Sequence, residues 1–123
     1  FPAHPRTQNI MKEHRLNIPQ TIRIIKPQGY LDFISLQANS QKIITDSGGI
    51  QKEAYIQKKP CLTIRPETEW VETIEDGWNM LVNPENEAFV KKIRDFHPTK
   101  KQSDIFGTNV TEKMVEVIRG NWQ

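Results

Sequence analysis

Cysteine is nearly absent from the sequence. The single cysteine, Cys61, has no partner with which to form a disulfide within the chain. It lies in the apolar run at residues 61–64, which predicts a buried thiol rather than a reactive one. A reducing, cytoplasmic setting fits this cysteine usage.

Long apolar stretches and a strong charge of one sign are absent as well. No segment approaches the roughly 20 apolar residues needed to cross a bilayer, so we expect no membrane partner. The formal net charge is only +2, and the basic residues are scattered among acidic ones, so we expect no nucleic-acid partner. His14 and His97 have no ligand-like spacing to Cys61, so no metal site is predicted.

What remains is the composition of an ordinary globular domain. The chain has 123 residues, of which 26% are charged and 36% are hydrophobic, and a domain of this size can bury a core without disulfides or metals. We therefore predict a single domain over residues 1–123. Residues 1–6 do not resemble a signal peptide and begin like the inside of a strand, so we expect an amino-terminal domain to be missing.

Alternation of short β-rich runs with helical segments is the main structural signal. Such β-α order favours an α/β fold, a Rossmann-like parallel sheet with helices on both faces. Residues 97–106 have no apolar period and predict a mobile surface loop. Strands are expected at residues 22–26, 42–45, 61–64 and 80–82, and helices at residues 7–15, 30–39, 50–57, 71–75, 87–95 and 108–119.

The junction after the strand at residues 42–45 is the most informative segment. Ser47, Gly48 and Gly49 lie between this strand and an amphipathic helix. Glycines there allow a sharp turn and the close approach of a ligand, while the first N–H groups and the dipole of the helix favour a phosphate or pyrophosphate. Glu53 follows Gly49 by four residues, so its carboxylate can lie beside the same gap and accept the two hydroxyls of a ribose.

A structural interpretation of the same residues stays open. Ser47 could serve only as a helix cap, and Glu53 could be a solvated surface charge, because Ser-Gly-Gly turns often precede helices for capping reasons alone.

A second dense segment, residues 65–79, follows the next expected strand. Arg65 could reach a phosphate, and the acids Glu69 and Glu72 could meet sugar hydroxyls or hold Arg65. In the alternative, the segment is a capped turn whose acids face water and whose Trp70 and Trp78 fill the core.

Several motifs in order carry a family resemblance. They are Pro-Ala-His-Pro-Arg at residues 2–6, Tyr-Leu-Asp-Phe at 30–33, Thr-Asp-Ser-Gly-Gly-Ile-Gln-Lys-Glu-Ala at 45–54, Lys-Pro-Cys-Leu-Thr-Ile-Arg at 59–65 and Glu-Thr-Glu-Trp-Val-Glu-Thr-Ile-Glu-Asp-Gly at 67–77. Together they cover nearly the whole chain, which resembles the carboxy-terminal half of the non-hydrolysing UDP-N-acetylglucosamine 2-epimerases.

The resemblance implies one half of a GT-B architecture that binds UDP and a UDP-N-acetylhexosamine. The family interconverts UDP-N-acetylglucosamine and UDP-N-acetylmannosamine by loss and return of UDP, in the service of cell-surface polysaccharide synthesis. No cofactor is expected, and the full-length protein could form a homodimer. The implied roles are Ser47, Gly48 and Gly49 at the phosphates, Glu53 at the ribose and Phe33 beside the uracil.

Other family features fall outside the chain or depart from the pattern. The catalytic acid and base groups belong to the missing domain, so none is assigned here and the chain alone is expected to be inactive. His4 resembles a position near a second, activating nucleotide-sugar site, although a histidine that only hydrogen-bonds a neighbouring turn fits as well. Trp70 stands where many bacterial members of the family have an arginine, and Lys58 stands where a helix-ending glycine is common. Residues 106–109 depart from the Phe-Gly-Asp-Gly pattern of many relatives.

Two other functions stay open on the residues alone. A UDP-sugar glycosyltransferase half would use the same strand, glycine turn and ribose glutamate. A stand-alone nucleotide-sugar binding module would also fit.

Overall fold

The structure, a computed structural model, describes residues 1–120. It divides into two compact units, Phe1–Asn39 and Ser40–Gln123, and each is described by itself.

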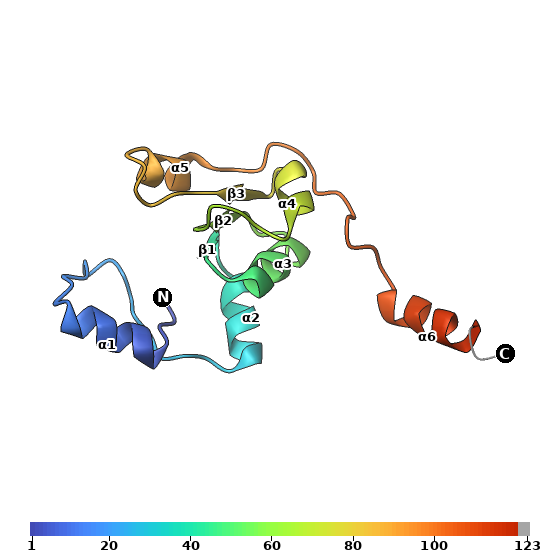
Figure 1. Ribbon diagram of the computed structural model, residues 1–123, viewed down its shortest axis with the longest axis horizontal. Coiled ribbons are helices and arrows are strands. Elements are labelled where there is room, and N and C mark those ends of the chain that lie inside the picture. Colours follow the sequence, from blue (N-terminus) through green and yellow to red (C-terminus); the bar gives the residue numbers. More distant parts are fainter. Residues whose placement is uncertain (121–123) are drawn as a thin grey trace. The chain divides into compact units, whose positions relative to one another are not determined.

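The first unit contains two helices, α1 (Pro5–Glu13) and α2 (Tyr30–Ala38) (Figure 1). Pro5 begins α1, where its missing N–H and fixed φ cost nothing, and the Nδ1 atom of His4 accepts a hydrogen bond of 3.2 Å from the Arg6 N–H. Asp32 lies in the first turn of α2, where a negative charge complements the helix dipole. Both predicted helices are therefore confirmed, with ends shifted by one or two residues.

The strand predicted at residues 22–26 is wrong. Only one bridge forms, between Pro2 and Ile25, with hydrogen bonds of 3.0 Å from the Ala3 N–H to the Ile25 carbonyl and from the Ile25 N–H to the Phe1 carbonyl. The next donor along this edge would be residue 27, a proline without an N–H. The Ala3 carbonyl instead accepts from the Nε2 atom of Gln8 at 2.8 Å, so the ladder does not continue past Ile25.

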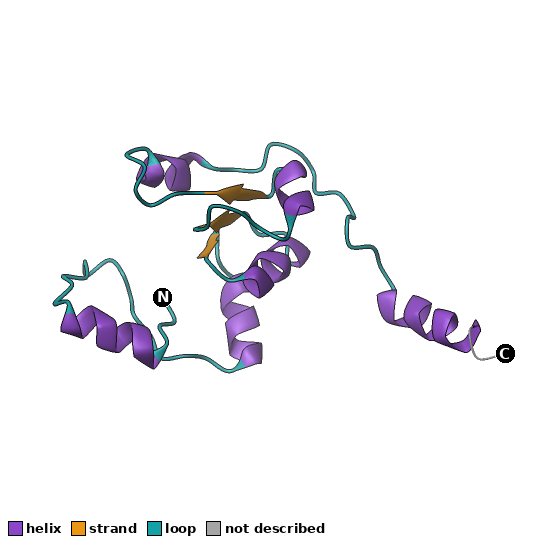
Figure 2. Cartoon of the chain, viewed as in Figure 1, coloured by secondary structure: helices purple, strands orange, loops and turns teal. Residues whose placement is uncertain are grey.

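The second unit is built around a parallel sheet of β1 (Ile43–Thr45), β2 (Cys61–Thr63) and β3 (Asn79–Leu81), in the order β1-β2-β3. The strands alternate with α3 (Gly48–Ile56) and α4 (Val71–Glu75), and α5 (Phe89–Asp95) and α6 (Val110–Gly120) follow (Figure 2). The three later predicted strands and the later helices are confirmed, with shifted ends. This β-α order is that of a parallel α/β fold.

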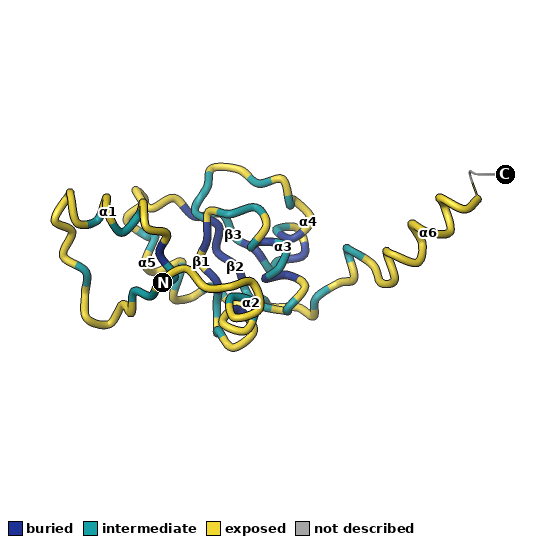
Figure 3. The backbone as a smooth tube through the Cα atoms, turned by 90° about the horizontal axis from the view of Figure 1, so that it is seen from below, coloured by how far each residue is buried: buried dark blue, intermediate teal, exposed yellow. Residues whose placement is uncertain are grey.

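The core lies along the central strand. All three residues of β2 are buried, and Ile43, Ala54 and Cys61 form a cluster against which Ile50 packs. Figure 3 shows the buried backbone concentrated in the three strands and α3. Cys61 is 1% exposed, so its predicted burial is confirmed. Burial raises the pKa of the Cys61 thiol to about 11, and its low reactivity stays a prediction.

The end of α3 has the hydrogen bonds of a glycine-type helix terminus. The Lys58 N–H donates to the Tyr55 carbonyl and the Lys59 N–H to the Ala54 carbonyl, each at 2.9 Å. Lys58 itself has a φ of 57°, in the left-handed region that glycine usually occupies at this position. The departure from the family pattern at Lys58 therefore places a strained residue there.

The segment at residues 97–106 lacks regular structure, as predicted, but it is held to the rest of its unit. The hydroxyl of Tyr55 donates to the Ser103 carbonyl at 2.8 Å, and the Nε2 atom of Gln102 donates to the Tyr55 carbonyl. The backbone N–H of Ser103 donates to Asp76 Oδ2 at 2.9 Å, and its hydroxyl donates to Oδ1 at 2.6 Å. The pattern of residues 97–106 does not indicate this anchoring.

Candidate functional site

The carboxyl ends of β1 and β2 lie side by side. Thr45 is paired with Thr63 in the parallel register, and the Ile64 N–H donates to the Thr45 carbonyl at 2.8 Å. Ser47 and Arg65 each follow their strand end by two residues, so the structure brings them to the same edge. Ligands of open parallel sheets bind at this edge, where the strands end and the loops begin.

Ser47 turns the chain from β1 into α3. Its backbone is extended, with φ −85° and ψ 129°, and its N–H donates to the Thr45 hydroxyl at 3.0 Å. The Ser47 side chain makes no capping hydrogen bond. The purely capping interpretation of this hydroxyl is therefore not supported, and its family role at a phosphate stays a prediction.

Gly48 and Gly49 form the first turn of α3, which begins two residues earlier than the sequence predicted. Neither has a positive φ, so backbone freedom is not what glycine provides here. Glycine provides space instead. A Cβ on Gly48 would overlap the Oε1 atom of Glu69, whereas a Cβ on Gly49 would have its nearest neighbour 3.9 Å away. The first N–H groups of a helix lack partners within it and carry the positive end of the dipole, so this turn suits an anion.

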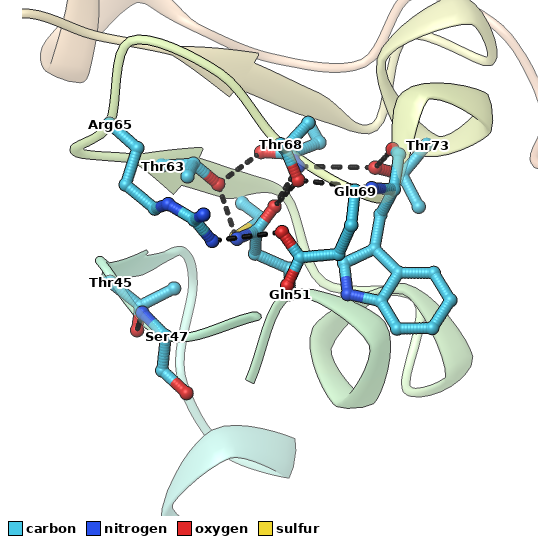
Figure 4. Close-up of polar contacts among 11 residues, drawn as sticks. Thr45, Ser47, Gln51, Thr63, Arg65, Thr68, Glu69 and Thr73 are labelled. Atoms are coloured by element: carbon cyan, nitrogen blue, oxygen red, sulfur yellow. Dashed lines mark hydrogen bonds and ion pairs between the residues drawn. The ribbon is translucent and has the colours of Figure 1, made fainter. Parts of the chain in front are cut away.

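Glu69 and Arg65 form an ion pair beside this turn. The Nη1 atom of Arg65 donates to Glu69 Oε2 at 2.9 Å, and Figure 4 shows the two side chains extended toward each other. The pKa of Glu69 lies below its usual value, first because its backbone N–H lies close to its carboxylate and then because of Arg65. A pocket opens beside Arg65 and is lined also by Val82, Asn83 and Pro84.

A buried polar network under the turn was missed by sequence reasoning. Gln51, which is fully buried in α3, accepts hydrogen bonds at Oε1 from the Thr68 hydroxyl at 2.6 Å and from Asn79 Nδ2 at 3.1 Å. Asn79 also donates to the Thr73 hydroxyl at 3.1 Å and accepts from the Thr63 hydroxyl at 2.8 Å. Polar residues at the inward positions of strands and helices were the available signal.

The network fixes the segment that carries the ion pair. The Thr68 hydroxyl also accepts from the Trp70 N–H at 3.1 Å, so residues 68–70 are tied to α3 through Gln51 (Figure 4). Glu69 lies between these two tethered residues. Its position over Gly48 is therefore imposed by the fold rather than by its own ion pair alone.

Trp70 lies among aromatic and cationic groups rather than in the core. Its ring meets Phe106 edge to face at 5.8 Å between centroids, and the Lys52 ammonium lies 4.8 Å from the Trp70 ring and 4.9 Å from the Phe106 ring. Trp70 and Trp78 are only half-buried, and the indole N–H of each is buried without a partner. The interpretation that both fill the core is therefore only partly met.

The remaining predicted residues are placed separately. Glu53 lies half-buried on α3, and Glu72 is exposed in the first turn of α4. Phe33 is half-buried on α2 and exposed His4 caps α1, both in the first unit. The structure therefore shows the turn contact foreseen for His4 and leaves the activator role a prediction.

Two kinds of feature are absent from residues 1–120. No group of three or more His, Cys, Asp or Glu side chains is arranged to hold a metal ion. No helix in this described part of the chain is both long and apolar enough to cross a membrane.

These observations define a parallel α/β unit with a glycine turn between β1 and α3. The family model described as UDP-N-acetylglucosamine 2-epimerase matches residues 1–119, and the chain belongs to this family. A UDP-N-acetylglucosamine 2-epimerase homolog of Methanococcus maripaludis is 46% identical over 97% of the chain and 35% of its own length. The chain thus spans about a third of the length of the curated relatives it matches.

Solved structures confirm the fold. The UDP-GlcNAc 2-epimerase of Methanocaldococcus jannaschii is 38% identical with a TM-score of 0.82, over 97% of this chain and 35% of that one. The same enzyme in complex with UDP-GlcNAc and UDP is 40% identical with a TM-score of 0.78, over 94% and 34% of the two chains. The predicted family and the Rossmann-like α/β class are confirmed.

Proposed function

We propose that the chain is the UDP-binding part of an enzyme that interconverts UDP-N-acetylglucosamine and UDP-N-acetylmannosamine. The single observation that carries the proposal is the β1-α3 turn, which offers a helix amino end without a Cβ at Gly48, beside Arg65. The family match supports the nucleotide, and a relative of known structure was solved with UDP-GlcNAc and UDP. The family match favours an epimerase over one half of a glycosyltransferase.

Different residues bind different parts of the nucleotide. Ser47, Gly48, Gly49 and Arg65 hold the phosphates, through a hydroxyl, helix N–H groups and a guanidinium. Glu53, one helical turn after Gly49, accepts the two ribose hydroxyls. For Phe33, in the first unit, the place beside the uracil is the role that the family resemblance implies. Glu69, Trp70 and Glu72 belong to the neighbourhood of the sugar and the phosphates.

The reaction assigned to this family runs by loss of UDP and its return after inversion at C2 of the sugar. The share of this chain is to keep the departing UDP in place, because a retained UDP can add back to the same sugar intermediate. The groups that move the C2 proton must lie within hydrogen-bond reach of the reacting carbon, and we assign them to the rest of a longer enzyme. We therefore expect no epimerase activity from the 123-residue chain by itself.

The cellular setting follows from the same proposal. A reducing cytoplasm suits the free and buried Cys61, and precursors of cell-surface polysaccharides are the products that such an enzyme supplies. We also propose that the full-length enzyme forms a homodimer.

Calorimetric titration with UDP and 2′-deoxy-UDP tests the ribose contact. Glu53→Gln should weaken UDP binding about tenfold, since hydrogen bonds to a charged group contribute about 1.5–3 kcal/mol each. The chain should prefer UDP over 2′-deoxy-UDP, and Glu53→Gln should reduce that preference. Glu116→Gln, an exposed change on α6, is the matched control. Equal affinity of the original chain for the two nucleotides would contradict the role of Glu53.

A further inference from the structure

A carboxylate of the chain itself, that of Glu69, lies against Gly48 in the turn to which the proposed function assigns the phosphates. The Oε1 atom of Glu69 lies so close to Gly48 that a Cβ on this glycine would overlap it. Its Oε2 atom accepts from Arg65 at 2.9 Å. Glu69 therefore contacts the amino end of α3 and forms an ion pair with Arg65, whose guanidinium the proposed function assigns to the nucleotide.

We propose that Glu69 is a tethered anion that competes with the nucleotide phosphates for the amino end of α3 and for Arg65. The proposal rests on the proposed function, because it concerns the same site. When UDP binds, the Glu69 carboxylate leaves Gly48, and Arg65 exchanges the carboxylate for a phosphate. When UDP leaves, Glu69 returns and again covers the turn.

The surroundings of Glu69 hold its backbone in one position but leave its carboxylate easy to displace. Thr68 and Trp70 hold the backbone on either side through the Gln51 network, so the carboxylate returns to one position. The side chains of Arg65 and Glu69 remain 34% and 50% exposed, and ion pairs at such exposure contribute little. A phosphate with more charge and more acceptor atoms can therefore replace the carboxylate.

Glycine at position 48 is explained by the same arrangement. The lack of a Cβ leaves room for one anion against the helix end, whether it is the Glu69 carboxylate or a phosphate. Two anions in this space would repel each other in addition to colliding, so the two states exclude each other.

Affinity measurements separate the competition from a merely structural role. In the 123-residue chain, Glu69→Gln removes the charge and keeps the size of the side chain, and Glu67→Gln removes an exposed charge two residues away. We expect Glu69→Gln to tighten binding of UDP and of inorganic pyrophosphate about two- to fivefold, the range for one charge at a helix end. Uridine, which has no phosphate, should bind both variants and the original chain equally.

Two results of this titration would overturn the proposal. If Glu69→Gln weakened UDP binding, Glu69 would be a contact of the ligand. If Glu67→Gln and Glu69→Gln tightened it equally, the effect would come from net charge and not from the contact with Gly48.

An observation without ligand tests the occupied state itself. Amide chemical shifts of Gly48 and Gly49, followed from pH 7 to pH 3, should move with the ionisation of Glu69 and should lose this movement in Glu69→Gln. Shifts indifferent to Glu69 would overturn the proposal even if UDP bound. Loss of UDP binding in every variant, with the glycine shifts still following Glu69, would overturn the proposed function and leave the carboxylate contact established.

Discussion

The hydroxyl of Tyr55 is the best single atom with which to test how the second unit is held together. Tyr55 is 4% exposed, and its hydroxyl lies 2.6 Å from Asp76 Oδ2 and 2.8 Å from the Ser103 carbonyl. It thus joins α3, the end of α4 and the segment at residues 97–106. Tyr55→Phe removes this atom and keeps the ring, which meets Phe106 edge to face at 5.3 Å.

The expected loss follows from the charge of the acceptor. A hydrogen bond to a charged group contributes about 1.5–3 kcal/mol, so Tyr55→Phe should lower the free energy of unfolding by about that amount. Urea unfolding followed by tryptophan fluorescence measures this loss. Tyr30→Phe, at a residue that is 69% exposed, is the matched control and should change little. A loss below about 0.5 kcal/mol for Tyr55→Phe would show that this hydroxyl does not stabilise the second unit.

The pH dependence gives the same prediction a second readout. Hydrogen bonds from Ser103, then from Tyr55, hold the pKa of the Asp76 carboxyl well below its usual value. A carboxyl group with a lowered pKa in the folded chain stabilises it above the unfolded value, about pH 4, and this stability is lost as pH falls through the folded value. The difference between Tyr55→Phe and the original chain should therefore be full at pH 7 and shrink below about pH 4.

The other predictions concern the end of α3 and the core. Lys58→Gly should raise the free energy of unfolding by about 1 kcal/mol, because glycine adopts the left-handed φ of 57° without strain. Lys59→Gly, at the next residue, is the control and should not raise it. Urea unfolding of both variants measures the difference. The Cys61 thiol, 1% exposed and with its pKa raised to about 11, should resist a thiol reagent in the folded chain at pH 7.5 and react fully in urea. A rapid reaction without urea would contradict the buried position.

Local pattern was enough to predict the β-α order, and the reason is visible in the second unit. The short runs that became β1, β2 and β3 are bounded by glycines, prolines and helical segments, so periodicity alone separates them. The same pattern was wrong at residues 22–26, because it cannot tell whether a partner strand can continue. There the proline at position 27 ended the ladder after a single bridge.

The candidate site could be predicted only where its residues are neighbours in sequence. Ser47 and Gly48 were found because a strand, a turn and a helix follow one another there. The contact of Glu69 with Gly48 and the anchoring of Ser103 by Asp76 join residues 21 and 27 positions apart. Such contacts depend on how the loops pack, which no spacing rule describes.

The proposed function depends above all on the binding of a nucleotide diphosphate at the β1-α3 turn. An amide chemical-shift titration of the 123-residue chain with UDP tests it most directly, with Glu53→Gln measured beside it. We expect saturable shifts clustered at residues 47–53 and at Arg65, and weaker binding in Glu53→Gln. Saturable shifts elsewhere on the chain, with residues 47–53 unmoved, would contradict it.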